Sequence, residues 1–334
     1  VHCFTLKMKN TLIILEYFIS LNPNLSDINN ATKNEGIKLI ENLCNILSKD
    51  CLDTEIYILK NYKIKLSVER KIKFLITKTK KDWVEVIKKF DLDTKVLLIA
   101  PETENIYMKM GKVIQGLGYN MLNPNLTTID LCSSKIKLIE KLEQLKIPHI
   151  KRYNESKKIK KELILKPDNS AGSENIFIIK KRKKLKKIKN KIKFKYILQK
   201  LHYGKKGSFS MICLNGRNIL LTCNKQLTQR NKKTIKQIGL DNGRYEKYRT
   251  NFKYLANLIS DNFKGLFGYV GVDVIKVNSE WRILEINARL TSSIIDIDKT
   301  YNNKVSDVIR NIYLSRSLEL KKKVILKKSK KIIF

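Results

Sequence analysis

The sequence has few residues of the kinds that build zinc sites or disulfide frameworks. Its 334 residues include three histidines and six cysteines. The cysteines show no CxxC spacing and the histidines are scattered, so no zinc-binding module is indicated. Several cysteines lie in apolar runs, which predicts buried free thiols in a reducing, cytoplasmic compartment. Long apolar runs are also missing. Because none reaches about 18 residues, we expect no membrane span.

Acidic residues are scarce as well. Only 31 Asp and Glu stand against 69 Lys and Arg, so the formal net charge is +38. Such a charge often marks a nucleic-acid-binding protein. Here, however, the lysines are spread along the whole chain with many isoleucines and asparagines, and arginine is rare beside lysine. No RNA-stacking or recognition-helix motif is apparent. We therefore interpret the charge as mostly solvated surface, with nucleic-acid binding kept as the alternative of another class.

The first part of the chain alternates between strand and helix patterns. A chain that is 43% hydrophobic at this length can form two or three domains with a sizeable core. The alternation predicts a parallel α/β domain over residues 1–130, and the absence of a GxGxxG turn argues against a dinucleotide fingerprint. Strands are expected at 11–19, 54–60, 72–77 and 95–102, and helices at 34–49, 82–90 and 103–117.

The pattern changes after residue 130. Ser134 is a good N-cap for a helix that runs to Lys146. A second domain is predicted over 131–317, followed by a basic tail at 318–334 to which we assign no function. Within this domain, the pattern predicts a strand–loop–strand unit at 163–180 and successive strands at 196–227. A helix at 248–262 and a hairpin at 268–293 follow.

The hairpin carries three oxygen-bearing side chains. Glu285 and Asn287 alternate on one face of the second strand. Asp273 and Glu285 are equally distant from Ser279, so a hairpin centred there would pair them. Such an all-oxygen cluster suits Mg²⁺ or Mn²⁺. A two-residue turn would shift the register and move Glu285 to the other face, so this metal prediction requires an odd-length connection. The alternative is a pair of solvent-exposed carboxylates.

A loop of small residues lies between two predicted strands. Small residues such as Ser170 and Gly172 let backbone N–H groups approach phosphate oxygens closely. Lys166, at the end of the preceding strand, would add an ammonium to the same phosphates. The strand that includes Gln199, Lys200 and Leu201 leads to a connector, and its extended backbone could bind an adenine edge. Each signal is weak alone, because a Lys-Pro dipeptide before a hairpin is common.

The order of these pieces resembles the ATP-grasp superfamily of carboxylate–amine ligases over roughly 130–293, and EINARLTSS resembles its Glu-x-Asn-Pro-Arg element. The resemblance implies an α/β N-terminal domain followed by an α+β ATP-grasp fold, whose two sub-domains clasp ATP. It implies ATP and Mg²⁺ (or Mn²⁺) as cofactors. By this resemblance, the lysines that bind the ATP phosphates are Lys135 and Lys166, and the flexible loop over the phosphates is Ser170, Ala171, Gly172 and Ser173. The resemblance also implies that the adenine linker is Gln199, Lys200 and Leu201. The implied metal ligands are Asp273, Glu285 and Asn287, and the implied arginine for the transferred phosphate or the carboxylate is Arg289.

Within the superfamily, stretches such as LLIAPETENI and LTCNKQL are similar to the tyramine–L-glutamate ligase group of methanofuran biosynthesis. That group joins the γ-carboxylate of glutamate to the amine of tyramine, so small-molecule substrates are expected, with a ligase for another amino acid or peptide as the alternative. The sequence departs from the superfamily pattern in two places. Ala288 replaces a proline, and Lys205-Lys206 replaces the acid that binds ribose. No general base is identified: His202 qualifies only by type, and Glu16, Glu35 and Glu102 could meet the amine or simply cap helices.

Overall fold

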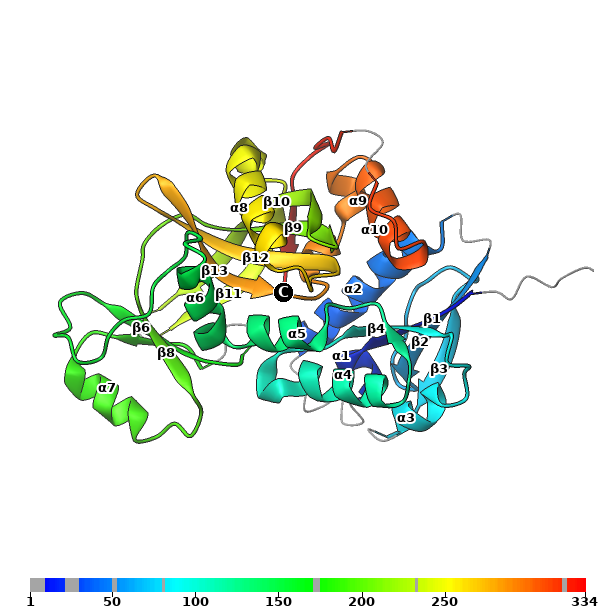
Figure 1. The fold of residues 1–334 in the computed structure, drawn as a ribbon, viewed down its shortest axis with the longest axis horizontal. Coiled ribbons are helices and arrows are strands. Elements are labelled where there is room, and N and C mark those ends of the chain that lie inside the picture. Colours follow the sequence, from blue (N-terminus) through cyan, green and yellow to red (C-terminus); the bar gives the residue numbers. More distant parts are fainter. Residues whose placement is uncertain are drawn as a thin grey trace, which may run out of the picture.

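The computed structural model describes most of the chain. Within the described residues, the chain forms three β-sheets with helices around them (Figure 1). No helix there is both long enough and apolar enough to cross a membrane. The described residues are 10–21, 30–49, 53–79, 82–170, 175–231, 234–319 and 323–334.

The first sheet is parallel and has five strands, in the order β3-β2-β1-β4-β5. The predicted α/β alternation is confirmed here, although the first strand ends at Glu16 and not at residue 19, because Tyr17–Leu21 form a short helix. The elements of this domain are β1 (Asn10–Glu16), α1 (Tyr17–Leu21), α2 (Asn30–Leu47), β2 (Thr54–Asn61), β3 (Lys73–Thr77), α3 (Asp82–Ile87), β4 (Lys95–Ile99), η2 (Thr103–Asn105), α4 (Ile106–Gly116) and β5 (Asn120–Met121).

The strand order reverses at β1, which lies between β2 and β4. In open parallel sheets, ligands bind beyond the carboxyl ends of the strands at such a switch point. Two buried carboxylates lie there. Glu16 ends β1 and Glu102 follows β4, and both are less than 7% exposed. The topology therefore places two acidic side chains at the edge of the sheet where a ligand is expected.

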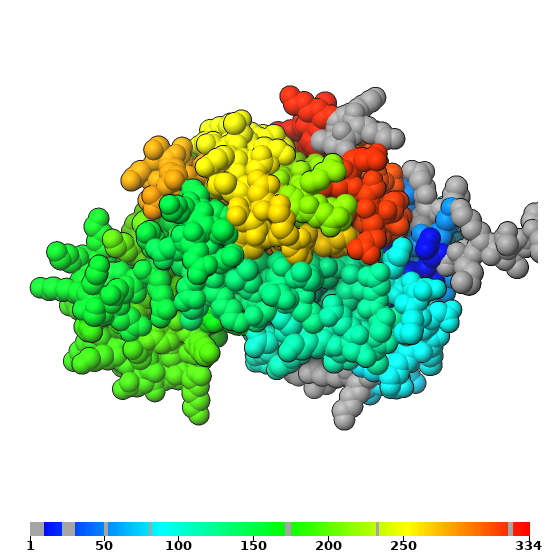
Figure 2. All heavy atoms as spheres, viewed as in Figure 1, coloured from blue at the N-terminus to red at the C-terminus, as the bar shows by residue number. Residues whose placement is uncertain are grey.

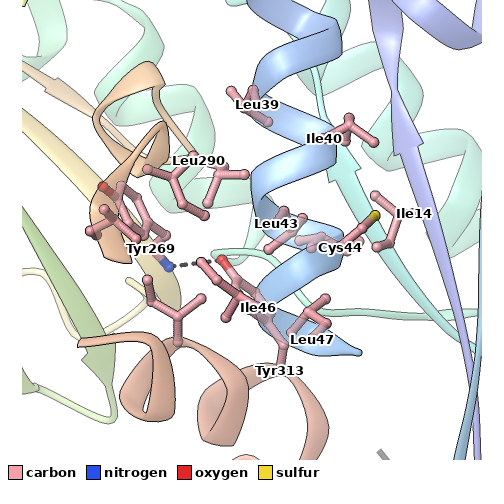
Figure 3. Packing of buried hydrophobic residues seen from close by; sticks show 14 of the residues in the cluster. Ile14, Leu39, Ile40, Leu43, Cys44, Ile46, Leu47, Tyr269, Leu290 and Tyr313 are labelled. Carbon is pink, nitrogen blue, oxygen red and sulfur yellow. Dashed lines mark hydrogen bonds between the residues drawn. The ribbon is translucent and has the colours of Figure 1, made fainter. Parts of the chain in front are cut away.

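Helix α2 joins this domain to the C-terminal part of the chain. Its buried residues face two ways, toward Ile14 of β1 on one side and toward Tyr269, Leu290 and Tyr313 on the other (Figure 3). The backbone N–H of Tyr269 donates a hydrogen bond to the Tyr313 hydroxyl at 3.0 Å. Each fully buried leucine or isoleucine contributes about 1.5–3 kcal/mol, so this packing fixes α2 firmly. Its buried apolar residues include Leu39, Ile40, Leu43, Cys44, Ile46 and Leu47.

A small antiparallel sheet and one helix form a separate lobe. The sheet order is β7-β6-β8. In the space-filling view this green lobe projects away from the parallel domain, leaving a notch between them (Figure 2). Its elements and the two helices that lead to it are α5 (Leu126–Ser133), α6 (Lys135–Gln144), β6 (Leu163–Pro167), β7 (Phe177–Ile179), α7 (Arg182–Lys189) and β8 (Tyr196–Lys200).

The third sheet is antiparallel and has six strands, in the order β13-β12-β9-β10-β11-β14. Its last strand comes from the basic tail, so residues that we expected to lie apart from the second domain complete its sheet edge against β11. The elements are β9 (Lys206–Leu214), β10 (Arg217–Arg230), β11 (Ile235–Asn242), η3 (Glu246–Tyr248), α8 (Arg249–Asn262), β12 (Gly268–Val277), β13 (Glu280–Asn287), η4 (Ser292–Ile294), α9 (Ile297–Thr300), α10 (Lys304–Leu314) and β14 (Lys330–Ile333).

Candidate active site

The hairpin β12–β13 pairs Asp273 with Glu285, as the sequence predicts, but for a different reason. The turn has two residues, Asn278 and Ser279, and not an odd number. Alone, it would move Glu285 to the other face. A β-bulge corrects the register: Val274 pairs with Ile283, and the next pair is Asp273 with Glu285, so Leu284 is the extra residue. The bulge therefore brings the two carboxylates together.

Asp273, Glu285 and Asn287 all remain partly exposed on this hairpin. Burial raises the pKa of Asp273 to about 7, and the neighbouring Glu285 adds to the rise. Hydrogen-bonding by Gln226 and the charge of Lys166 act in the opposite direction. Two facing carboxylates with an amide oxygen nearby are a donor set that fits Mg²⁺ or Mn²⁺. No group of three or more His, Cys, Asp or Glu that could hold a metal occurs in the described part of the chain.

Lys135 reaches Glu285 from the N-terminus of α6. Its Nζ lies 2.9 Å from Glu285 Oε1 and donates to the backbone oxygen of Ser170 at 3.0 Å. Ser134 caps the helix as predicted. Asp168, which we had not singled out, fixes the same helix end by accepting hydrogen bonds from the Ile136 N–H and the Ser134 hydroxyl. This anchoring holds the Lys135 ammonium beside the facing carboxylates of the hairpin.

Lys166 faces the same space from β6. Burial lowers its pKa to about 8, helped by the neighbouring Lys135 and Lys206, while Glu285 and Asp273 oppose that change. Lys166 lines a cavity between the small and the large antiparallel sheets, together with Lys135, Asp273 and Glu285. The predicted phosphate lysines and two of the predicted metal ligands therefore share one cavity.

The predicted adenine linker borders this cavity as well. Gln199, Lys200 and Leu201 all line it, beside apolar side chains such as Ile164 and Ile275. The Gln199 side chain is engaged elsewhere, because its Nε2 donates to the Ile150 carbonyl at 2.7 Å. This bond leaves the backbone of the linker as the part suited to an adenine edge.

The small-residue loop is only partly described. Ser170 lies at the cavity wall and contacts Lys135, whereas Ala171, Gly172 and Ser173 lie outside the described residues. At the departure from the ribose-binding pattern, Lys206 lines the cavity. The chain thus places a cation where the resemblance led us to expect an acid. His202 also lines this cavity, next to the linker, and burial and the nearby Arg282 lower its pKa.

Arg289 links the loop after β13 to the loop after β4. Its Nε and Nη2 donate to the two oxygens of Glu102 at 2.8 and 2.9 Å, a bidentate pair that the sequence did not predict. Burial alone would lower the pKa of Arg289, but Glu102, Glu35 and Glu285 more than offset this effect and raise it. The guanidinium therefore stays charged and is held in one orientation.

Arg289 lines a second cavity of about 450 Å³. Asp273 and Glu285 line this cavity and the first one, so the two cavities meet at the facing carboxylates. The lining of the second cavity combines residues of strands β9, β11 and β12 with residues from distant parts of the chain, among them Glu35 of α2, the loop after β13, and Phe334 next to β14. His202 does not line it.

Glu16 lies next to Gly36 of α2 and is 4% exposed. It accepts a hydrogen bond from the Ile19 N–H at 2.8 Å, yet burial raises its pKa to about 7, and Glu35 adds to the rise. Because the folded pKa lies above the unfolded value, wild-type protein should lose stability as the pH rises from about 4.5 to about 7. Glu16→Gln should escape this loss, which amounts to at most about 3 kcal/mol.

The free energy of unfolding in urea is measured at about pH 5 and about pH 8, and the value for wild type is subtracted from that of Glu16→Gln. The gain of Glu16→Gln should appear mainly at the higher pH. Glu69→Gln, at an exposed position, is the control and should track wild type. Parallel pH profiles for Glu16→Gln and wild type would contradict this account of Glu16.

Comparison with known families identifies the class of protein. Residues 132–293 match the family model described as an ATP-grasp domain. This match shows that residues 132–293 form an ATP-grasp domain, and the fold agrees with it.

Individual relatives agree with this class. A tyramine–L-glutamate ligase from Methanocaldococcus jannaschii is 26% identical over 290 residues, which is 85% of this chain and 80% of the relative. An ATP-grasp superfamily protein from Archaeoglobus fulgidus has 19% identity and a TM-score of 0.68, covering 90% of this chain and 87% of that chain. N5-carboxyaminoimidazole synthetase from Staphylococcus aureus, complexed with ADP, has 13% identity and a TM-score of 0.69, covering 97% and 82%.

Proposed function

We propose that the chain is an ATP-dependent carboxylate–amine ligase that works through an acyl phosphate. The observation that carries the proposal is the meeting of two cavities at Asp273 and Glu285. One cavity is lined by Lys135 and Lys166, which we expect to bind phosphate, and by the predicted adenine linker. The other has Arg289 and enough volume for small substrates. A γ-phosphoryl group at their junction would therefore lie next to a carboxylate in the second cavity.

The reaction has two steps. A carboxylate oxygen attacks the γ-phosphorus of ATP, the bond to ADP breaks, and an acyl phosphate forms. The amine nitrogen then attacks the acyl carbon, the C–O bond breaks, and phosphate leaves as the amide forms. Both steps depend on positioning and on charge neutralisation. Lys135 and Lys166 would oppose the phosphate charges, and Arg289 would hold the carboxylate or the transferring group.

Asp273, Glu285 and Asn287 would hold Mg²⁺, which offsets negative charge on phosphate oxygens. Lys135 already neutralises Glu285 at 2.9 Å. Glu285 could therefore contact both Lys135 and the bound Mg²⁺. The backbone around Ser170 supplies the near end of the loop that would cover the phosphates.

The distribution of acid supports a cationic substrate in the second cavity. Lys and Arg outnumber Asp and Glu by 69 to 31 in the whole chain. In the second cavity the balance is different: three acidic side chains (Glu35, Asp273 and Glu285) line it beside two basic ones (Lys236 and Arg289), and the charge of Arg289 also acts on the pKa of Glu16. Such a local surplus of negative charge suits both a metal ion and an amine.

For the particular substrates, we propose the γ-carboxylate of L-glutamate and tyramine, as in the name of the M. jannaschii relative. Another amino acid or peptide remains the alternative. The test is a panel in which glutamate and other amino acids are each combined with several amines, with ADP and the amide measured together. Glutamate with tyramine should give the highest rate. A higher rate with another pair would contradict the proposed substrates but support the ligase class.

A further inference from the structure

Glu35 is an unusual carboxylate for this chain. It lines the second cavity from α2, together with Thr32 on the same helix. Its Oε1 accepts a hydrogen bond from the Ser292 hydroxyl, in the loop after β13. In the part of the chain that the structure describes, Glu35 forms no salt bridge, whereas Glu102 is paired with Arg289 and Glu285 with Lys135. The charge of Arg289 acts on Glu35, but Arg289 is paired directly with Glu102, so Glu35 can still accept a second cation.

The helix that carries Glu35 is held rigidly. The packing of Leu39, Ile40 and Leu43 between the parallel sheet and the C-terminal helices fixes α2 (Figure 3). Ser292 belongs to a loop that is itself fixed, because the Ser293 hydroxyl shares hydrogen bonds with Ser210 at 2.6 Å and with Tyr269 at 2.8 Å. The Glu35 carboxylate is therefore preorganised at the cavity wall, which lowers the entropic cost of binding a ligand there.

The cavity also has an apolar wall. Ile238 and Leu240 of β11 line it, as does Phe334, whose N–H donates to the Ile238 carbonyl at 3.1 Å. In this cavity the nitrogen of an amine could contact Glu35, while an apolar or aromatic group of the same amine contacts the apolar wall. Neither Glu35 nor Phe334 lies in the matched ATP-grasp residues 132–293.

We propose that Glu35 binds the nitrogen of a primary ammonium substrate, with Phe334 and its apolar neighbours contacting the rest of that substrate. This inference rests on the proposed ligase function and adds to it the residues that select the amine. Burial raises the pKa of Glu35, while Ser292 and Arg289 lower it. Glu16 and Glu102 are the other acidic groups on the adjoining strand ends. A cation in the cavity would further favour the ionised form of Glu35.

The test compares two nucleophiles in Glu35→Gln. With the amine substrate, the KM for the amine should rise at least about 10-fold, the equivalent of losing one charge-assisted contact. The KM values for ATP and for the carboxylate should stay near wild type. Hydroxylamine is largely uncharged near neutral pH and captures acyl phosphates as hydroxamates. Hydroxamate formation should therefore be unchanged, because this nucleophile does not need the carboxylate.

Two further variants separate binding from a structural role. Glu35→Asp keeps the charge and should recover part of the amine affinity. Glu41→Gln, on the same helix but outside the cavity, should behave as wild type. An unchanged amine KM in Glu35→Gln, or an equal loss of amide and hydroxamate, would overturn the assignment of Glu35. If wild type forms hydroxamate with none of the carboxylates tested, the ligase proposal itself fails, and the Glu35 assignment fails with it.

Discussion

Asp273→Asn is expected to lower the ligation rate by at least about 10³-fold, because the lost charge stabilisation is worth several kcal/mol. Asp273 faces Glu285 across the hairpin and lies where both cavities meet. Asparagine keeps the shape but removes a negative charge from the cation site. Glu285→Gln should have a similar effect, with the added loss of the contact to Lys135 at 2.9 Å.

The fold should survive Asp273→Asn. Two facing, partly buried carboxylates repel each other, so neutralising one should leave the ligand-free protein at least as stable as wild type. The thermal stabilisation by Mg²⁺ and ATP together should be much reduced, since ligand binding to the native state is its source. Glu280→Gln, at the exposed end of the same hairpin, is the matched control. Near-normal turnover in Asp273→Asn would refute the metal assignment.

Arg289→Met should have the largest effect on stability. The guanidinium neutralises Glu102 through two hydrogen bonds of 2.8 and 2.9 Å, and Glu102 is 6% exposed. Removing the arginine leaves a buried carboxylate without its partner, which typically costs 3–5 kcal/mol. We expect a loss of about 3 kcal/mol in urea unfolding because Arg289 keeps some contact with solvent. Turnover should fall about 10²–10³-fold.

The double variant Arg289→Met/Glu102→Gln separates these two effects. Neutral glutamine needs no cation, so most of the lost stability should return. Activity should stay low, because no group then holds the carboxylate or the transferring phosphoryl group. Arg282→Met is the control, since its partner Glu280 is exposed and such surface pairs contribute little. If activity returned with stability in the double variant, the role of Arg289 would be only structural.

The hairpin marks how far the sequence can predict this site. Alternation and spacing predicted correctly that Asp273 and Glu285 pair. The predicted odd-length connection was wrong, because the turn is Asn278-Ser279 and Leu284 forms a bulge. No glycine or proline marks this bulge, and a leucine there looks like any strand residue. Bulges depend on cross-strand context, which a strand pattern alone does not contain.

The other gaps concern contacts between distant residues. Ser134 was predictable as a cap because its partner, the Lys137 N–H, is three residues away. The pairing of Arg289 with Glu102 spans 187 residues, and it depends on how the loop after β4 meets the loop after β13. The chain order of strands does not specify that geometry. Similarly, β14 completes a sheet whose other strands precede it by many residues, so its basic composition alone suggested only a tail.

The transfer of oxygen from substrate to phosphate tests the central claim most directly. The carboxylate substrate is labelled with oxygen-18 on both oxygens, and the phosphate released during amide formation is analysed by mass spectrometry. An acyl-phosphate route predicts one labelled oxygen in each phosphate, with the other retained in the amide, because the C–O bond breaks in the second step. Amide formation with unlabelled phosphate, or with label in AMP instead, would contradict the account.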